Sequence, residues 1–186
     1  MLCRALCFVA IAVAGLSAGG CAATPPPGPR NPRAVVMAHD DARATGTLAF
    51  PTAGYESVVR FQLPDGEHRP LRLRLQAEAP GLVEITIYDS TVLETPGDPI
   101  HKVTRDLVKE DLSDGHDGRW VVEDLGEMKP IKGVIWVGVH KVGGTPTIWA
   151  SSVVSGQAFV RNNDPTDPMG LLPSKRTPMI RLELAP

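Results

Sequence analysis

The acidic residues best suited to hold a metal ion lie close together in one short segment. Asp111, Asp114 and Asp117 recur every three residues, and Gly115 and Gly118 each follow an aspartate. Calcium prefers carboxylate oxygens, and a loop that wraps several of them around one point can bind it. The segment lacks the spacing and the bidentate glutamate of an EF-hand. Because Asp-Gly pairs are also typical of a hairpin turn, a plain turn is the favoured alternative to a calcium site.

Aromatic side chains are the second group that could do chemistry, because a flat apolar ring with a polar edge suits the face of a sugar. Aromatic residues make up only 5% of the chain, which is few for a carbohydrate site. Trp120 and Trp136 fall inside expected strands and are predicted to be core residues. Trp149, beside Ile148 and Ala150, is predicted to be the most exposed and is the candidate ligand-binding residue.

No catalytic motif is recognisable in the chain. The sequence contains no Gly-x-Ser-x-Gly, no His-Glu-x-x-His and no glycine-rich phosphate loop. We therefore expect a protein that is not an enzyme. The alternative is an envelope hydrolase, which would gather His39, His116 and the carboxylates of the 162–176 segment into one cleft.

The elements that must position these residues are strands. Apolar and polar residues alternate in 59–63, 71–78, 83–88 and 180–184, as expected where one face of a strand is buried and the other is wet. Residues 134–139 are apolar on both faces and predict a central strand. Weaker strand patterns occupy 45–50, 101–107, 120–125, 147–151 and 157–161.

Turn signals separate these segments, and 18 glycines and 18 prolines leave little room for long helices. Tight reversals are predicted at 79–81, where Pro80 precedes Gly81, and after a strand at Gly143 and Gly144. In the 71–78 strand, Gln76 is predicted to lie on the solvent side. Many short alternating strands predict an all-β fold, a two-sheet antiparallel β-sandwich of jelly-roll type.

The first 21 residues have the character of an export signal. Arg4 supplies a positive charge, residues 5–16 are apolar, and small residues lead to Cys21. The apolar stretch is too short for a lasting transmembrane helix. Cys3 and Cys7 belong to this segment, so Cys21 is the only cysteine left after its removal. An intrachain disulfide is then excluded.

The end of this segment, from Leu16 to Cys21, resembles the lipobox of bacterial lipoproteins, with Ala18 where that family prefers leucine. The resemblance implies that residues 1–20 are cleaved and that Cys21 is acylated and anchors the chain to membrane lipid. Ala22, in place of aspartate, implies the outer membrane in a Gram-negative cell. Residues 21–34 are rich in proline and alanine and predict an extended tether, which is followed by a domain at 35–186.

The order of segments 59–64, 71–75, 83–89, 118–125 and 134–139 resembles the jelly-roll accessory domains of secreted bacterial proteins, which are similar in shape to galactose-binding-like domains. The resemblance implies a binding or structural module of the cell envelope, with envelope protein or glycan as its partner. We expect no cofactor other than a structural calcium ion in the 111–118 loop. Charges of both signs are interleaved and sum to −2, which excludes a nucleic-acid surface.

Overall fold

The computed structural model describes residues 34–52, 54–116, 118–162 and 169–185. Cys21, the expected signal segment and the tether as far as residue 33 lie outside these residues, as does Asp117. Within the described part of the chain, the regular structure consists of strands and one short 3-10 turn, Lys109–Asp111. The predicted all-β class is therefore confirmed. No helical segment among these residues has the length and apolar character needed to cross a membrane.

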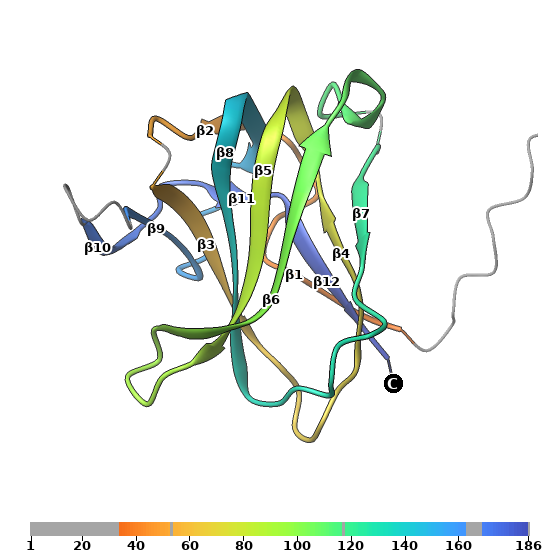
Figure 1. The fold of residues 1–186 in the computed structure, drawn as a ribbon, viewed down its shortest axis with the longest axis vertical. Coiled ribbons are helices and arrows are strands. Elements are labelled where there is room, and N and C mark those ends of the chain that lie inside the picture. The colour runs from red at the N-terminus through yellow and green to blue at the C-terminus, as the bar shows by residue number, and fades with distance from the viewer. Residues whose placement is uncertain (1–33, 53, 117, 163–168, 186) are drawn as a thin grey trace, which may run out of the picture. The chain divides into compact units, whose positions relative to one another are not determined.

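The strands form two antiparallel sheets (Figure 1). The smaller sheet has the order β1 (Val35–Ala38), β12 (Ile180–Leu184), β4 (Pro70–Leu75) and β7 (Val121–Asp124). It brings the first and last described strands side by side, since Val35 pairs with Leu184. The two edge strands of this sheet are β1 and β7.

The larger sheet is organised around its two longest strands, β5 and β8, which pair with each other. Short strands β2 and β11 pair with the second half of β8. Its order is β10 (Met169–Pro173), β9 (Ala158–Asn162), β3 (Tyr55–Gln62), β8 (Val134–Ser151), β5 (Ala77–Ser90) and β6 (Pro96–Leu107), with β2 (Gly46–Ala49) and β11 (Thr177–Pro178) outside this path.

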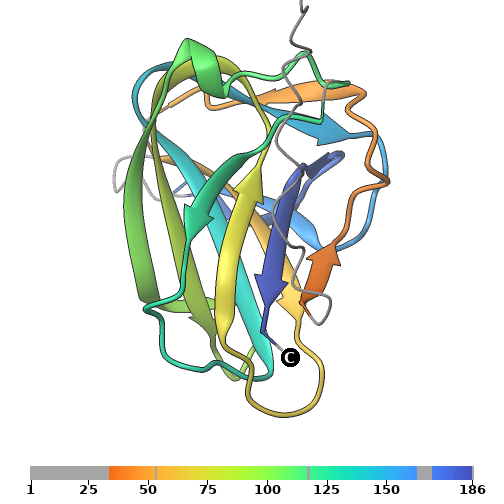
Figure 2. The same cartoon turned by 90° about the vertical axis from the view of Figure 1, so that its right-hand side faces the viewer.

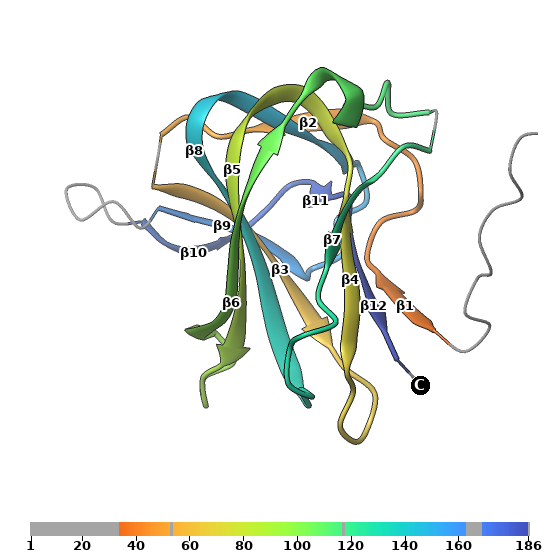
Figure 3. The same ribbon diagram turned by 45° about the vertical axis from the view of Figure 1, so that its right-hand side comes forward.

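The hydrophobic core lies between the facing surfaces of the two sheets (Figure 3). Phe61 on β3 and Ile85 on β5 contribute to it from the larger sheet, and Leu73 on β4 and Leu182 on β12 contribute from the smaller one. All four are buried, and burying a side chain of this size contributes about 2 kcal/mol. The alternation predicted for these strands is confirmed, because its apolar members point between the sheets. The two-sheet β-sandwich is the fold that the pattern predicts.

Two glycine segments that were predicted to reverse the chain lie within continuous strands instead. Gly81 of β5 pairs with Gly144 of β8, and their φ angles are +149° and +70°. A Cβ on Gly81 would lie 2.6 Å from Pro146 Cδ, and one on Gly144 would lie 3.2 Å from Gly81 Cα. The missing side chains let both strands bend together, as their shared arch in Figure 3 shows. The predicted reversals at 79–81 and 143–144 were wrong, because glycine permits a bend within a strand as well as a turn.

A buried ionic network lies on the face of the larger sheet that is turned away from the core. The Glu56 carboxylate is fully buried and accepts hydrogen bonds from the Tyr88 hydroxyl at 2.8 Å and from Arg161 Nε at 2.6 Å. The Arg161 guanidinium also lies 4.7 Å from the centre of the Tyr88 ring. Burial and the adjacent Glu56 carboxylate raise the pKa of Tyr88 to about 12. The network joins β3, β5 and β9 across the sheet.

Removing the Glu56 carboxylate should strongly destabilise the domain. Glu56→Ala leaves the Arg161 charge, whose side chain is 16% exposed, without its buried partner, and we expect a loss of about 3 kcal/mol in the free energy of unfolding. Glu94→Ala is the matched control, since that carboxylate pairs with Arg60 at 2.8 Å but is 66% exposed. Its removal should cost less than about 1 kcal/mol. Equal losses for the two variants in urea denaturation would contradict this account of the network.

Candidate functional site

A pocket of about 500 Å³ lies where loops from both sheets meet, and we refer to it as the loop-end pocket. The connection between β1 and β2 forms one side, and the connection between β6 and β7 forms another. Figure 2 shows these two connections close to each other at one end of the strands. The lining comes from residues 42–45, Gln76, Gly115, His116, Gly118, Trp120 and Arg181.

Arg181 forms one wall of the pocket and is fixed from two sides. Its Nη2 donates to Asp40 Oδ1 at 2.6 Å and its Nε donates to Oδ2 at 3.3 Å. Its guanidinium lies 4.5 Å from the centre of the Trp120 ring. The Asp40 side chain is fully buried, whereas Arg181 keeps 23% of its side chain exposed. The charged pair therefore holds both Arg181 and the aromatic ring in place beside the cavity.

Gln76 contributes a buried amide to the same pocket. The residue is 3% exposed, and its Oε1 is buried without a hydrogen-bond partner. Its backbone is held on both sides, since its N–H donates to Met179 O and its carbonyl accepts the Trp149 N–H at 2.9 Å. The prediction that Gln76 faces solvent was wrong, because β4 ends at Leu75 and the chain changes sheets at the next residue. Alternation holds only within a continuous strand.

Trp149 does not line the loop-end pocket, but it packs against Gly115, which does. Its indole Nε1 donates to Ser113 O at 2.8 Å, and the ring is half-buried. A Cβ on Gly115 would lie 3.2 Å from Trp149 Cε2 and 2.9 Å from Ala44 Cβ, so the ring packs against the glycine backbone. Trp149 is thus less exposed than the sequence predicted, and its role as a ligand-binding residue stays a prediction.

Of the other two tryptophans, Trp120 differs from expectation and Trp136 is buried as expected. Trp120 precedes β7 and is half-buried at the pocket wall, so its assignment to the core was wrong. Trp136 is buried as predicted, at 1% exposed, but it packs against Phe159 with ring centres 5.4 Å apart. The Trp136 and Phe159 rings lie on the outer face of the larger sheet. The neighbours of Trp136 in the strand, Ile135 and Val137, point to the opposite face and into the core.

Two of the three aspartates proposed as calcium ligands, Asp111 and Asp114, accept local backbone hydrogen bonds. Asp111 Oδ2 accepts the Val108 N–H at 3.1 Å, and its Oδ1 lies 3.6 Å from an Arg105 nitrogen. Asp114 Oδ1 accepts the His116 N–H at 2.8 Å, as in a turn. Within the described ranges no three His, Cys, Asp or Glu residues form a metal-binding group. Since Asp117 lies outside those ranges, calcium binding by the loop stays a prediction.

The histidines proposed for a hydrolase occupy different surroundings. His39 stacks on Phe61, with ring centres 5.0 Å apart, and burial lowers its pKa below the ordinary value. His116 is exposed on the β6–β7 connection beside the loop-end pocket. Asp40, the neighbour of His39, is committed to Arg181. The hydrolase alternative gains no paired acid and base from these contacts and stays a prediction.

The loop-end pocket offers the groups that hold a polar ligand. Arg181 and the exposed Arg43 carry N–H donors, Gln76 carries an unpaired acceptor, and Trp120 carries an apolar ring. A few converging polar groups beside an aromatic side chain are typical of small-molecule sites. Trp120, Gln76 and Arg181 come from three segments that are distant in the sequence. No local motif could have indicated that they meet.

Comparisons with known proteins inform the fold and little else. No family model matches the sequence, and no curated protein matches it significantly. The chain is similar to the structure of the cysteine protease and lectin-like domains of a surface layer associated protein of Clostridium difficile, with a TM-score of 0.59 and 6% identity. The match covers 84% of this chain but only 36% of that chain. At this identity, the similarity shows a shared β-sandwich architecture.

A second similarity joins the chain to a structure of infectious bursal disease virus, Gx strain. Its TM-score is 0.28 at 16% identity, and it covers 82% of this chain and 36% of that chain. A TM-score this low carries no argument about fold or function.

Two glycines in the β6–β7 connection allow a controlled test of how tightly the loop packs. Gly115 and Gly118 have φ angles of +85° and +69°, so alanine at either position is strained by about 1 kcal/mol. A Cβ on Gly118 meets nothing within 4 Å, whereas one on Gly115 meets Ala44 and Trp149. Gly115→Ala should therefore cost about 2 kcal/mol more than Gly118→Ala in thermal or urea unfolding. Equal costs would show that the loop does not pack tightly against Ala44 and Trp149.

Proposed function

We propose that the chain is a lipid-anchored binding module of the bacterial cell envelope, and that its loop-end pocket binds a hydroxyl-rich glycan. The anchor is supported by the signal-like residues 1–20, the lipobox resemblance at Cys21 and the proline-rich segment that follows. Acyl chains on Cys21 would hold the module at the membrane, and the tether would let the sandwich reach its ligand. Ala22 favours the outer membrane where the cell is Gram-negative.

The choice of a glycan as the ligand rests on one observation, which is the buried and unpaired Oε1 of Gln76 at the loop-end pocket. A buried amide oxygen without a partner costs about 1–3 kcal/mol. The Gln76 oxygen is closed to solvent in this structure, so a ligand hydroxyl would have to shift the lining in order to donate to it and recover that free energy. Sugars supply many hydroxyls in fixed directions together with an apolar face. Trp120 and the guanidinium of Arg181 line the same cavity and suit those two features.

The structural similarity is compatible with this assignment. The matched structure includes a lectin-like domain by its description, which supports carbohydrate as the ligand class to test first. The chain spans about a third of that protein, so any activity of the rest of that protein is not transferred here.

Replacing the unpaired amide should separate binding from stability. Gln76→Leu removes the buried oxygen at nearly constant volume, so the melting temperature should stay the same or rise slightly. Affinity for the best ligand in a panel of neutral oligosaccharides and soluble peptidoglycan fragments should fall at least tenfold by calorimetry. Gln62→Leu is the matched control, because Gln62 is exposed at the end of β3. This substitution should leave the affinity unchanged. Binding that survives in Gln76→Leu, or no binding by the unaltered chain, would refute the glycan proposal.

The anchor is tested separately by the chemistry of Cys21. Mass spectrometry of the protein from its native membrane should find residues 1–20 removed and a fatty-acylated cysteine as the first residue. Cys21→Ser should move the protein from the membrane fraction to the soluble fraction, since one acyl chain or none gives at most marginal membrane binding. An unprocessed chain that begins at Met1 in the soluble fraction would show that the segment is not a lipoprotein signal.

A further inference from the structure

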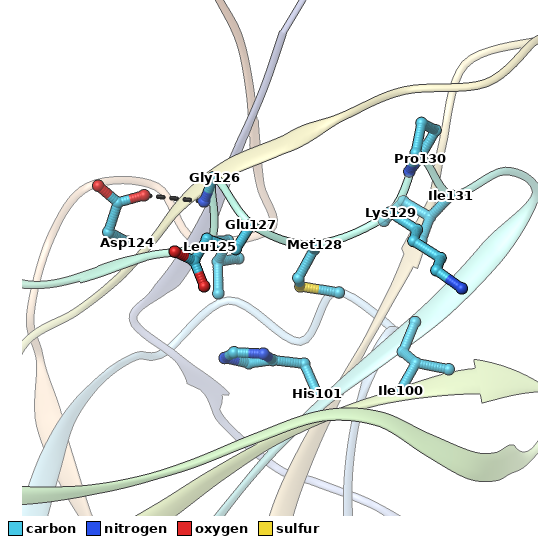
Figure 4. A pocket seen from close by; sticks show the side chains of 10 residues that line it. All are labelled: Ile100, His101, Asp124, Leu125, Gly126, Glu127, Met128, Lys129, Pro130 and Ile131. Carbon is cyan, nitrogen blue, oxygen red and sulfur yellow. Dashed lines mark hydrogen bonds between the residues drawn. The ribbon is translucent and has the colours of Figure 1, made fainter.

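A second and larger cavity, of about 1000 Å³, opens between the edges of the two sheets. Its walls are strand β6 of the larger sheet and the connection that runs from β7 to β8 (Figure 4). We refer to it as the inter-sheet pocket. Its volume lies at the upper end of the range for small-molecule sites. It shares no lining residue with the loop-end pocket, so its chemistry can be argued independently of the proposed glycan site.

One part of the inter-sheet pocket is apolar and continuous with the core. Met128 and Ile131 are partly buried and pack against the core cluster, and Leu125 is a member of it. Across the cavity, Ile100 on β6 is 41% exposed although it is a large aliphatic residue. Figure 4 shows the Met128 and Ile100 side chains pointing into the space between the two walls. An apolar group placed there would gain about 25 cal/mol for each Å² that it and the lining remove from water.

The other part of the pocket collects polar side chains, two of which are carboxylates. His101 Nε2 is buried and has no partner, and Asp124 and Glu127 line the same pocket. Asp124 Oδ1 accepts the Gly126 N–H at 2.8 Å, which leaves its second oxygen available. Among the described residues no lysine, arginine or histidine forms an ion pair with either carboxylate. In Figure 4 these groups lie toward the left of the view, and the Lys129 ammonium extends toward the right, beside Ile100.

We propose that the inter-sheet pocket binds a small primary amine, a molecule with an apolar body and one protonated amino group. The ammonium would donate to the exposed carboxylates of Asp124 and Glu127, because it carries three donors and no acceptor. The apolar body would lie against Met128 and Ile100. A carboxylate head group would instead meet two like charges, and an alcohol would satisfy one acceptor without balancing the negative charge.

A head-group series on one alkyl chain tests this assignment in the full-length chain. Octylamine, octanol and octanoate are titrated into protein labelled with 13C at the methionine methyls, and the Met128 signal is assigned from Met128→Leu. We expect octylamine to shift the Met128 methyl with a dissociation constant at least tenfold lower than that of octanol, and octanoate to bind most weakly. Equal affinity for the three compounds would overturn the amine assignment. Shifts of similar size at the other methionine methyls would overturn the assignment of binding to the inter-sheet pocket.

Two carboxylate variants locate the head group. Glu127→Gln should weaken the preference for octylamine over octanol, because it removes one of the two negative charges without altering size. Glu110→Gln is the matched control, since Glu110 is exposed on the 3-10 turn and does not line the pocket. Both residues are exposed, so neither change should affect folding, which a melting curve checks. An unchanged preference in Glu127→Gln would refute the charge argument, whereas Gln76→Leu should leave octylamine binding unchanged.

Discussion

The close pairing of Gly81 with Gly144 is the constraint on which the arrangement of the loops depends. β5 and β8 bend together at this pair, and the far side of the bend carries the first residues of β5 and the last residues of β8. Those residues hold the β6–β7 connection, since Ala77 O accepts the Ser113 N–H at 2.8 Å. A side chain at Gly81 would collide with Pro146 and force the two strands apart. The loop-end pocket thus depends on two residues that contribute nothing to its lining.

The periodic parts of the fold could be predicted from the sequence, and the bends could not. Alternation identified the buried faces of β3, β4, β5 and β12, because one face of each packs in the core over several residues. At Gly81 and Gly144 the same glycine signal fits a turn or a bend, and only pairing with a distant strand selects the bend. Gln76 was misplaced for a related reason, since the alternation of β4 was extended one residue past the end of the strand. Local patterns fail where long-range pairing decides the path of the chain.

The candidate site was predictable only in part. The β6–β7 connection was recognised as a place for chemistry, and the structure places it beside the loop-end pocket. Of the acidic residues that drew attention to it, Asp111 and Asp114 accept hydrogen bonds from nearby backbone N–H groups. The residues that give the pocket its polarity, Gln76 and Arg181, come from strands whose patterns indicated ordinary sheet positions. Arg181 reaches the pocket because the buried Asp40 carboxylate holds it there, a pairing across 141 residues that no spacing rule reveals.

Unpaired buried polar atoms carry more information about binding than charged residues in this domain. A solvated carboxylate on a loop costs little, so by itself it does not mark a binding site. A buried acceptor without a partner costs about 1–3 kcal/mol, which is a sizeable fraction of a typical domain's stability of 5–15 kcal/mol. His39 Nε2 is also unpaired, but its ring is stacked on a core phenylalanine and lines neither pocket described here. Gln76 Oε1 and His101 Nε2 differ because each belongs to a residue that lines a cavity large enough for a ligand.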